Sequence, residues 1–156
     1  MTRRPVEIIH RTNELGRKVG RVKLDPEKLK KAQAVVAALA QDYRPRLLEE
    51  SRQIAARWKE TQGAADALNE LHRLAHDIKG QGATFGYPLA TEVAAALCKL
   101  FTSDVFKHPK ACEVVEAHIQ ALVAIANEPI TGDGGAIGAA LIDGLRQTRA
   151  KVGLDV

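Results

Sequence analysis

Residues 64–86 read AADALNELHRLAHDIKGQGATFG and carry the clearest helical pattern in the chain. Apolar residues recur there every three or four positions, which predicts one helix from Ala64 to Phe85 with a single buried face. Gly80 and Gly82 interrupt the pattern, although a glycine inside a helix costs about 0.5–1 kcal/mol relative to alanine. The predicted core positions are Leu68, Leu71, Leu74, Ala75, Ile78, Gly82 and Phe85.

Helical patterns also occupy the flanking sequence, at residues 26–44, 45–62, 88–102, 109–127 and from 133 onward. A single helix over residues 26–62 would be about 55 Å long, so Pro45 is expected to break it near Arg44. Asp133 is expected to cap the last helix within the turn-rich GDGGAIG of residues 132–138. The inward positions expected in that helix are Ile137, Leu141 and Leu145.

These patterns predict an all-α protein. The helices from Pro45 onward are similar in length and joined by short loops, which favours an antiparallel up-and-down four-helix bundle. The helix before Pro45 is then an additional N-terminal helix that lies over one end or side. With 156 residues and 46% hydrophobic residues, the chain is long enough for one core, so residues 25–156 are assigned to one domain.

Residues 1–24 form a basic N-terminal arm with seven lysines and arginines against Glu7 and Glu14. We interpret it as a solvated extension, with contact to nucleic acid or an acidic partner as the alternative. No aromatic residue lies among its charges, so we expect no nucleic-acid partner. The chain has no apolar run of membrane-spanning length and no signal-peptide pattern, so we expect a cytoplasmic protein. Cys98 and Cys112 are expected to be buried, reduced thiols.

His76 lies on the polar face of the helix over residues 64–85, away from the apolar face. An exposed, neutral imidazole has a free nitrogen lone pair and is a nucleophile. Lys79, one turn away, can support the oxygens of a phosphoryl group placed on that nitrogen. Gly80 leaves the approach to the imidazole open, whereas Gly82 lies on the core face and permits close helix packing.

The eleven residues 76–86, HDIKGQGATFG, resemble the signature of histidine-containing phosphotransfer domains. That signature reads H-x-[LI]-K-G, followed by a glycine ten residues after the histidine. The first domain of chemotaxis histidine kinases resembles this stretch equally well, but the chain has no room for the other kinase domains. The matching residues are His76, Ile78, Lys79, Gly80 and Gly86.

The resemblance implies a phosphorelay carrier of two-component signalling. His76 would accept a phosphoryl group from a receiver-domain aspartate, or from a sensor or hybrid histidine kinase, and pass it to a response-regulator receiver. Lys79 would support the phosphoryl group, and the partner receiver would supply Mg²⁺, so the protein needs no cofactor of its own. It would be a carrier and not an enzyme, because no nucleotide-binding motif is visible. The expected docking surface is His72, Arg73, Gly80 and Ala83.

Two alternatives from other classes remain. A catalytically silent module of the same fold would bind a kinase or receiver without accepting phosphate. A zinc site would use His72 and His76, four residues apart, but Arg73 and Lys79 would repel a cation there. His118 is expected at the edge of an apolar face, and His10 and His108 at surface or turn positions. No apolar face beyond the bundle core stands out, so a monomer is expected.

Overall fold

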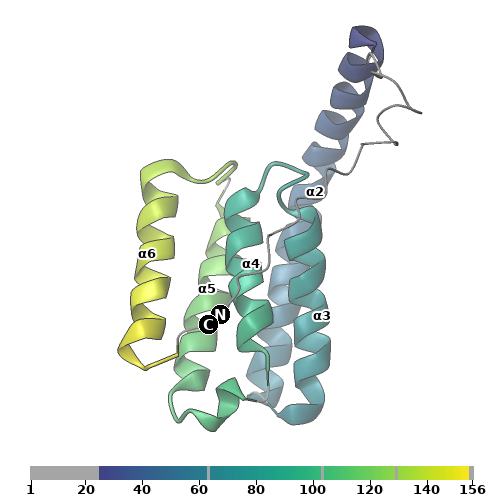
Figure 1. Cartoon of the computed structure of the whole chain (residues 1–156). Coiled ribbons are helices and arrows are strands. Elements are labelled where there is room, and N and C mark those ends of the chain that lie inside the picture. Colours follow the sequence, from purple (N-terminus) through teal and green to yellow (C-terminus); the bar gives the residue numbers. More distant parts are fainter. Residues whose placement is uncertain (1–24, 63, 103, 129, 155–156) are drawn as a thin grey trace, which may run out of the picture. The chain divides into compact units, whose positions relative to one another are not determined.

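The computed structural model describes residues 25–62, 64–102, 104–128 and 130–154 (Figure 1). All regular structure within these ranges is helical, which confirms the all-α prediction. The basic arm lies outside the described residues, so the boundary expected between residues 24 and 25 stays a prediction. The elements are α2 (Pro26–Thr61), α3 (Ala65–Gln81), α4 (Pro88–Leu100), the short 3₁₀ helix η1 (Val105–Lys107), α5 (Ala111–Asn127) and α6 (Gly135–Lys151).

The chain divides into two units between Gln33 and Ala34. In the first unit, the described residues 25–33 are exposed and open helix α2. The backbone N–H of Glu27 donates to Oδ1 of Asp25 at 3.0 Å, so Asp25 caps the helix as its position before Pro26 predicts. The second unit holds the core and every site discussed below.

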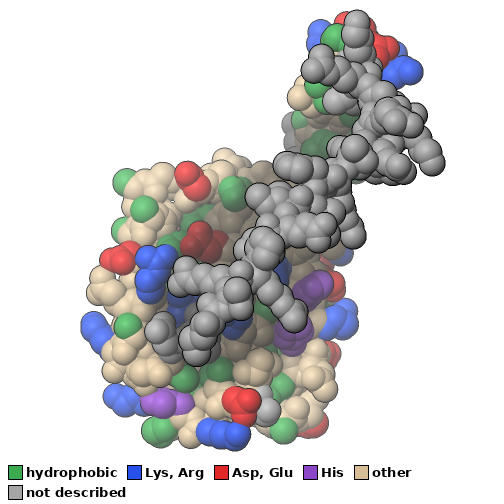
Figure 2. All heavy atoms as spheres, in the orientation of Figure 1, with side chains coloured by type: hydrophobic (Ala, Val, Ile, Leu, Met, Phe, Trp, Pro, Cys, Tyr) green, Lys and Arg blue, Asp and Glu red, His purple; other side chains and the backbone are tan. Residues whose placement is uncertain are grey.

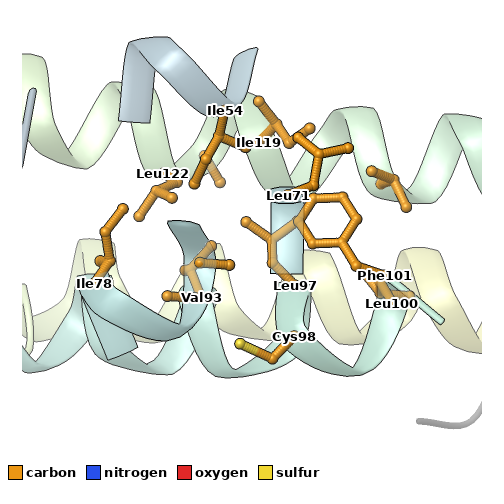
Figure 3. Packing of buried hydrophobic residues seen from close by; sticks show 14 of the residues in the cluster. Ile54, Leu71, Ile78, Val93, Leu97, Cys98, Leu100, Phe101, Ile119 and Leu122 are labelled. Atoms are coloured by element: carbon orange, nitrogen blue, oxygen red, sulfur yellow. The ribbon is translucent and has the colours of Figure 1, made fainter. Parts of the chain in front are cut away.

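The second unit is a helical bundle in which helices adjacent in sequence pack side by side: α3 with α4, α4 with α5, and α5 with α6 (Figure 1). Side chains of four helices point toward one another in its interior (Figure 3). Ile54 of α2, Leu71 of α3, Leu97 of α4 and Leu122 of α5 are all fully buried there. Each such side chain stabilises the fold by about 1.5–3 kcal/mol.

The break expected at Pro45 is wrong, because α2 runs without interruption from Pro26 to Thr61. Residues on both sides of the proline are held by the bundle. Tyr43 is buried and its ring stacks on Phe85 with centroids 4.7 Å apart, and Leu47 is fully buried. Tertiary contacts therefore override the local cost of a proline in a helix. Within the described residues, the segment before Pro45 is part of α2 and not a separate helix.

The core face predicted for residues 64–85 is confirmed at its helical positions, but the helix is shorter than expected. Leu68, Leu71 and Ile78 are buried, while α3 ends at Gln81 and residues 82–86 form turns. Gly86 has φ +88°, a left-handed conformation that glycine adopts without strain, and this reverses the chain toward α4.

Gly82 lies where the end of α3 approaches the start of α4. A Cβ added to it would lie 2.6 Å from Oγ1 of Thr91 and 3.1 Å from the carbonyl oxygens of Ile78 and Tyr87. The close packing predicted for this glycine is therefore confirmed.

The turn predicted in residues 132–138 is confirmed. The N–H of Gly135 donates to Oδ1 of Asp133 at 2.9 Å within this turn. The cap expected at Asp133 is wrong, because α6 begins at Gly135 and its N-cap residue is Gly134. The inward position expected for Ile137 is wrong, because this side chain is 72% exposed. Gly138 takes the buried place, since a Cβ there would collide with the carbonyl oxygen of Asp133.

Candidate functional site

His76 lies on the exposed face of α3, opposite the buried residues Ala75 and Ile78. Figure 2 shows histidine side chains on the surface over α3. No hydrogen bond holds the His76 ring within the part of the chain that the structure describes, so its nitrogens are open to an incoming group. The structure thus confirms the exposure that the helical pattern predicts.

His72 is half-buried and lies one turn before His76 on the same face. The two rings stack, with centroids 6.1 Å apart and planes inclined by 23°. Among the described residues, no group of three or more histidine, cysteine or acidic side chains is placed to hold a metal ion.

Lys79 is exposed one turn after His76. Its positive charge is close enough to the thiol of Cys98 on α4 to act on it. Burial raises the pKa of that thiol, and the charge of Lys79 opposes the increase. The ammonium group therefore lies on the side of α3 that faces α4.

Arg73 is exposed and pairs with Asp77, with 3.4 Å between Nη1 and Oδ2. The sequence analysis assigned no role to Asp77, although an arginine followed by an aspartate four residues later is a helix ion-pair pattern. An exposed pair of this kind contributes at most about 1 kcal/mol. The pair therefore places a carboxylate beside the guanidinium on the face that carries the histidines.

Gly80 and Ala83 are both exposed. A Cβ added at Gly80 would meet no atom within 4 Å, so the internal packing of the protein does not require glycine there. Ala83 lies in the turn after α3 and not within the helix as expected. Neither of these two positions therefore projects a bulky side chain from the surface beyond His76.

A groove of about 390 Å³ adjoins His72. Phe101 and Thr102, which follow α4, line it together with residues of α3. Helix spacing within one element could not identify these two residues, because their proximity to His72 depends on how α3 and α4 pack. The face that carries His76 therefore includes a hollow that the sequence analysis missed.

The remaining histidines and cysteines differ in part from expectation. His118 is fully buried and not at an edge, and Cys112 is exposed and not buried. His108 lies in a turn, as expected, and accepts the N–H of Lys110 on Nδ1 at 3.2 Å. Cys98 is buried as expected, and His10 lies outside the described residues.

None of the helices in the described ranges is both long and apolar enough to cross a membrane.

Comparison with known proteins identifies the family of the chain. The family model of the Hpt domain matches residues 30–126, which include most of α2, all of α3 and α4, and α5 up to its penultimate residue. Neither the curated proteins nor the solved structures contain a match. Hpt domains are phosphocarriers of two-component signalling that interact with receiver domains and kinases. The match covers well over half of the 156 residues, and the chain belongs to the Hpt domain family.

Proposed function

We propose that this protein is a phosphorelay carrier and that His76 is its phosphoacceptor. A receiver-domain aspartate or a histidine kinase would donate the phosphoryl group, and a response-regulator receiver would take it away. The observation that carries the proposal is the exposed, unencumbered imidazole of His76 within a chain of the Hpt family. We assign α2 to α5, the helices within the family match, to the up-and-down four-helix bundle.

The transfer step is a displacement at phosphorus. A ring nitrogen of His76 attacks the phosphorus of the aspartyl phosphate, the N–P bond forms, and the P–O bond to the aspartate breaks to release a carboxylate. The reverse sequence loads the next receiver. The transition state is loose, so most of the rate comes from alignment and charge neutralisation. Mg²⁺ held by the receiver supplies part of that charge.

On this chain, Lys79 would supply positive charge to the transferred phosphoryl group. Its ammonium would donate a charge-assisted hydrogen bond to one of the equatorial phosphoryl oxygens, over which negative charge is spread in the transition state. Because the group is exposed and unpaired among the described residues, it is free to do so.

The receiver would dock on His72, Arg73, Gly80 and Ala83, with the groove beside His72 taking a side chain of the partner. The open space above Gly80 and Ala83 supports this placement. A transient complex needs only a modest interface, and the carrier would act as a cytoplasmic monomer without autokinase activity.

The test is phosphoryl transfer from a panel of radiolabelled, phosphorylated receiver domains. We expect acid-labile, base-stable label on the wild type and none on His76→Gln. His72→Gln is the matched control, because it removes a stacked imidazole one turn away and should keep the label, even if at a lower rate. Receivers that bind the wild type without labelling it would favour the silent interaction module.

A further inference from the structure

A cavity of about 200 Å³ lies between α4, α5 and α6. Glu92 and Lys99 of α4 line it, with His118 of α5 and Arg146 and Arg149 of α6. None of its lining residues comes from α3, so it is separate from the site around His76. Figure 2 shows a hollow between α6 and α4 with charged side chains beside it.

His118 holds one of the arginines in place. Its Nδ1 lies 2.7 Å from the carbonyl oxygen of Val114, which can only accept, so Nδ1 carries the proton. Nε2 then has a lone pair and accepts from Nη1 of Arg149 at 3.0 Å. Burial lowers the pKa of His118, and the charge of Arg149 lowers it further, which keeps the ring neutral. The guanidinium of Arg149 is therefore fixed at the cavity by a neutral acceptor.

The charges at the cavity are not balanced. Lys99, Arg146 and Arg149 are positive, and Glu92 is the one acidic residue among the lining residues. Within the described ranges, none of the three cations forms an ion pair with a carboxylate. Like charges in a hollow repel one another more strongly than on an open surface, so an anion placed between them is favoured.

The size of the cavity limits the ligand. Pockets for cofactors and other ligands of drug size have volumes of about 300–1,000 Å³, and this cavity is smaller. Arginine side chains recognise the planar carboxylate and the tetrahedral phosphate through paired N–H donors. The carboxylate of Glu92 can accept a hydrogen bond from a hydroxyl or amino group on the same ligand.

We propose that the cavity between α4, α5 and α6 binds one small oxyanion, a phosphate or carboxylate group, between Lys99, Arg146 and Arg149. The site does not depend on phosphorylation of His76. It gives the bundle a second, non-covalent place for an anion on helices that do not carry the phosphoacceptor.

The experiment is titration of the full chain, ¹⁵N-labelled, with inorganic phosphate and separately with malonate. Sodium chloride keeps the ionic strength constant, so that general screening does not change. We expect saturable shifts of the amide signals that line the cavity, Ala95, Ala96 and Leu145 among them. Saturation by phosphate alone or by malonate alone identifies which oxyanion chemistry the site takes.

Arg146→Gln and Lys99→Gln each remove an exposed cation from the cavity without opening the core. Each should weaken the binding by about tenfold or more, the usual effect of losing a hydrogen bond to a charged group. Lys151→Gln is the matched control, because it removes an equal charge from the exposed end of α6, away from the cavity lining. Equal effects of Arg146→Gln and Lys151→Gln overturn the proposal, as do shifts that do not saturate or that centre on α3.

Discussion

At the scale of single residues, the two glycines beside His76 have opposite surroundings. Gly80 has open space where a Cβ would be, and Gly82 has Oγ1 of Thr91 and two backbone carbonyls. The missing side chain therefore leaves the surface open at Gly80 and permits close packing at Gly82.

Replacing each glycine by alanine separates these roles. Gly80→Ala should raise the free energy of unfolding by about 0.5–1 kcal/mol, the helix preference of alanine, yet slow transfer from a receiver. Gly82→Ala should lower the free energy of unfolding by about 1–3 kcal/mol through overpacking. Urea unfolding measures both. A destabilised Gly80→Ala variant would show that the space above Gly80 is needed by the fold.

Lys79→Glu tests the support of the phosphoryl group. Reversal of this charge should slow loading of His76 by about ten- to a hundredfold, since it replaces a charge-assisted hydrogen bond by repulsion. The melting temperature should change little because the side chain is exposed. Rapid-quench transfer kinetics with a phosphorylated receiver give the rate, and Lys59→Glu on α2 controls for net charge. A rate equal to that of the wild type would remove Lys79 from the mechanism.

The buried His118 should make the free energy of unfolding of the protein depend on pH. Its pKa in the folded state lies below the ordinary value, first because of burial, so the unfolded chain binds the proton more readily. The stability from its neutral form is fully present above about pH 6.5 and is lost as the pH falls toward the folded pKa. Urea unfolding at pH 7.5 and 5.5 should show a larger loss in the wild type than in His118→Gln. An equal loss in the wild type and in His118→Gln would contradict this assignment.

At the scale of helices, periodicity predicted most elements because each one buries a single face. The buried face of α3 and the inward residues Val93 and Leu97 of α4 follow directly from residue spacing. The break expected at Pro45 was wrong because residue spacing gives no information about the burial of Tyr43 and Leu47, which holds the helix in the bundle on both sides of the proline.

The exposure of His76 and Lys79 was also predictable, since both belong to one helix and their spacing puts them away from its apolar face. The groove formed with Phe101 and the cavity around His118 were not predictable. Both depend on how separate helices pack, and a single sequence does not encode this packing as a local pattern.

Pro45→Ala tests the strain in α2. The alanine restores a backbone donor for the carbonyl of residue 41 and removes the proline ring from the helix interior. The free energy of unfolding should rise by about 1–3 kcal/mol. Thermal unfolding followed by circular dichroism measures the change, and Pro88→Ala, at the first position of α4, is the control that should not stabilise. A loss of stability in Pro45→Ala would show that the proline relieves strain instead of causing it.

At the scale of the whole molecule, the segment after the phosphoacceptor helix is tied to the C-terminal part of the chain. The N–H of Gly132 donates to the carbonyl of Gly86 at 2.8 Å, and the N–H of Leu89 donates to the carbonyl of Gly132 at 3.3 Å. Leu145 and Leu154 are buried beyond residue 126, where the family match ends. The last thirty residues therefore stabilise the turn at Gly86, which ends the signature stretch of residues 76–86.

A truncated chain that ends at Asn127 should still accept a phosphoryl group on His76 but should be less stable. It loses the two backbone bonds and the burial of two leucines, about 3 kcal/mol or more. Calorimetry should show a lower melting temperature, and slow labelling by a receiver should persist below it. An unchanged melting temperature would mean that α6 and its loop do not stabilise the bundle.

On the function that we propose, the exposure of His76 bears on where the energy of the carried phosphate is kept. The ring makes no hydrogen bond with the described residues, and its stacking partner His72 is itself only half-buried. We therefore expect phosphorylation to change the packing of the bundle little, and the loaded and empty forms to unfold with similar free energies. The transfer potential would then stay in the N–P bond instead of being converted into a change of shape. Direction along the relay would be set by the receivers and by the supply of phosphate, and the carrier would pass the group in both directions.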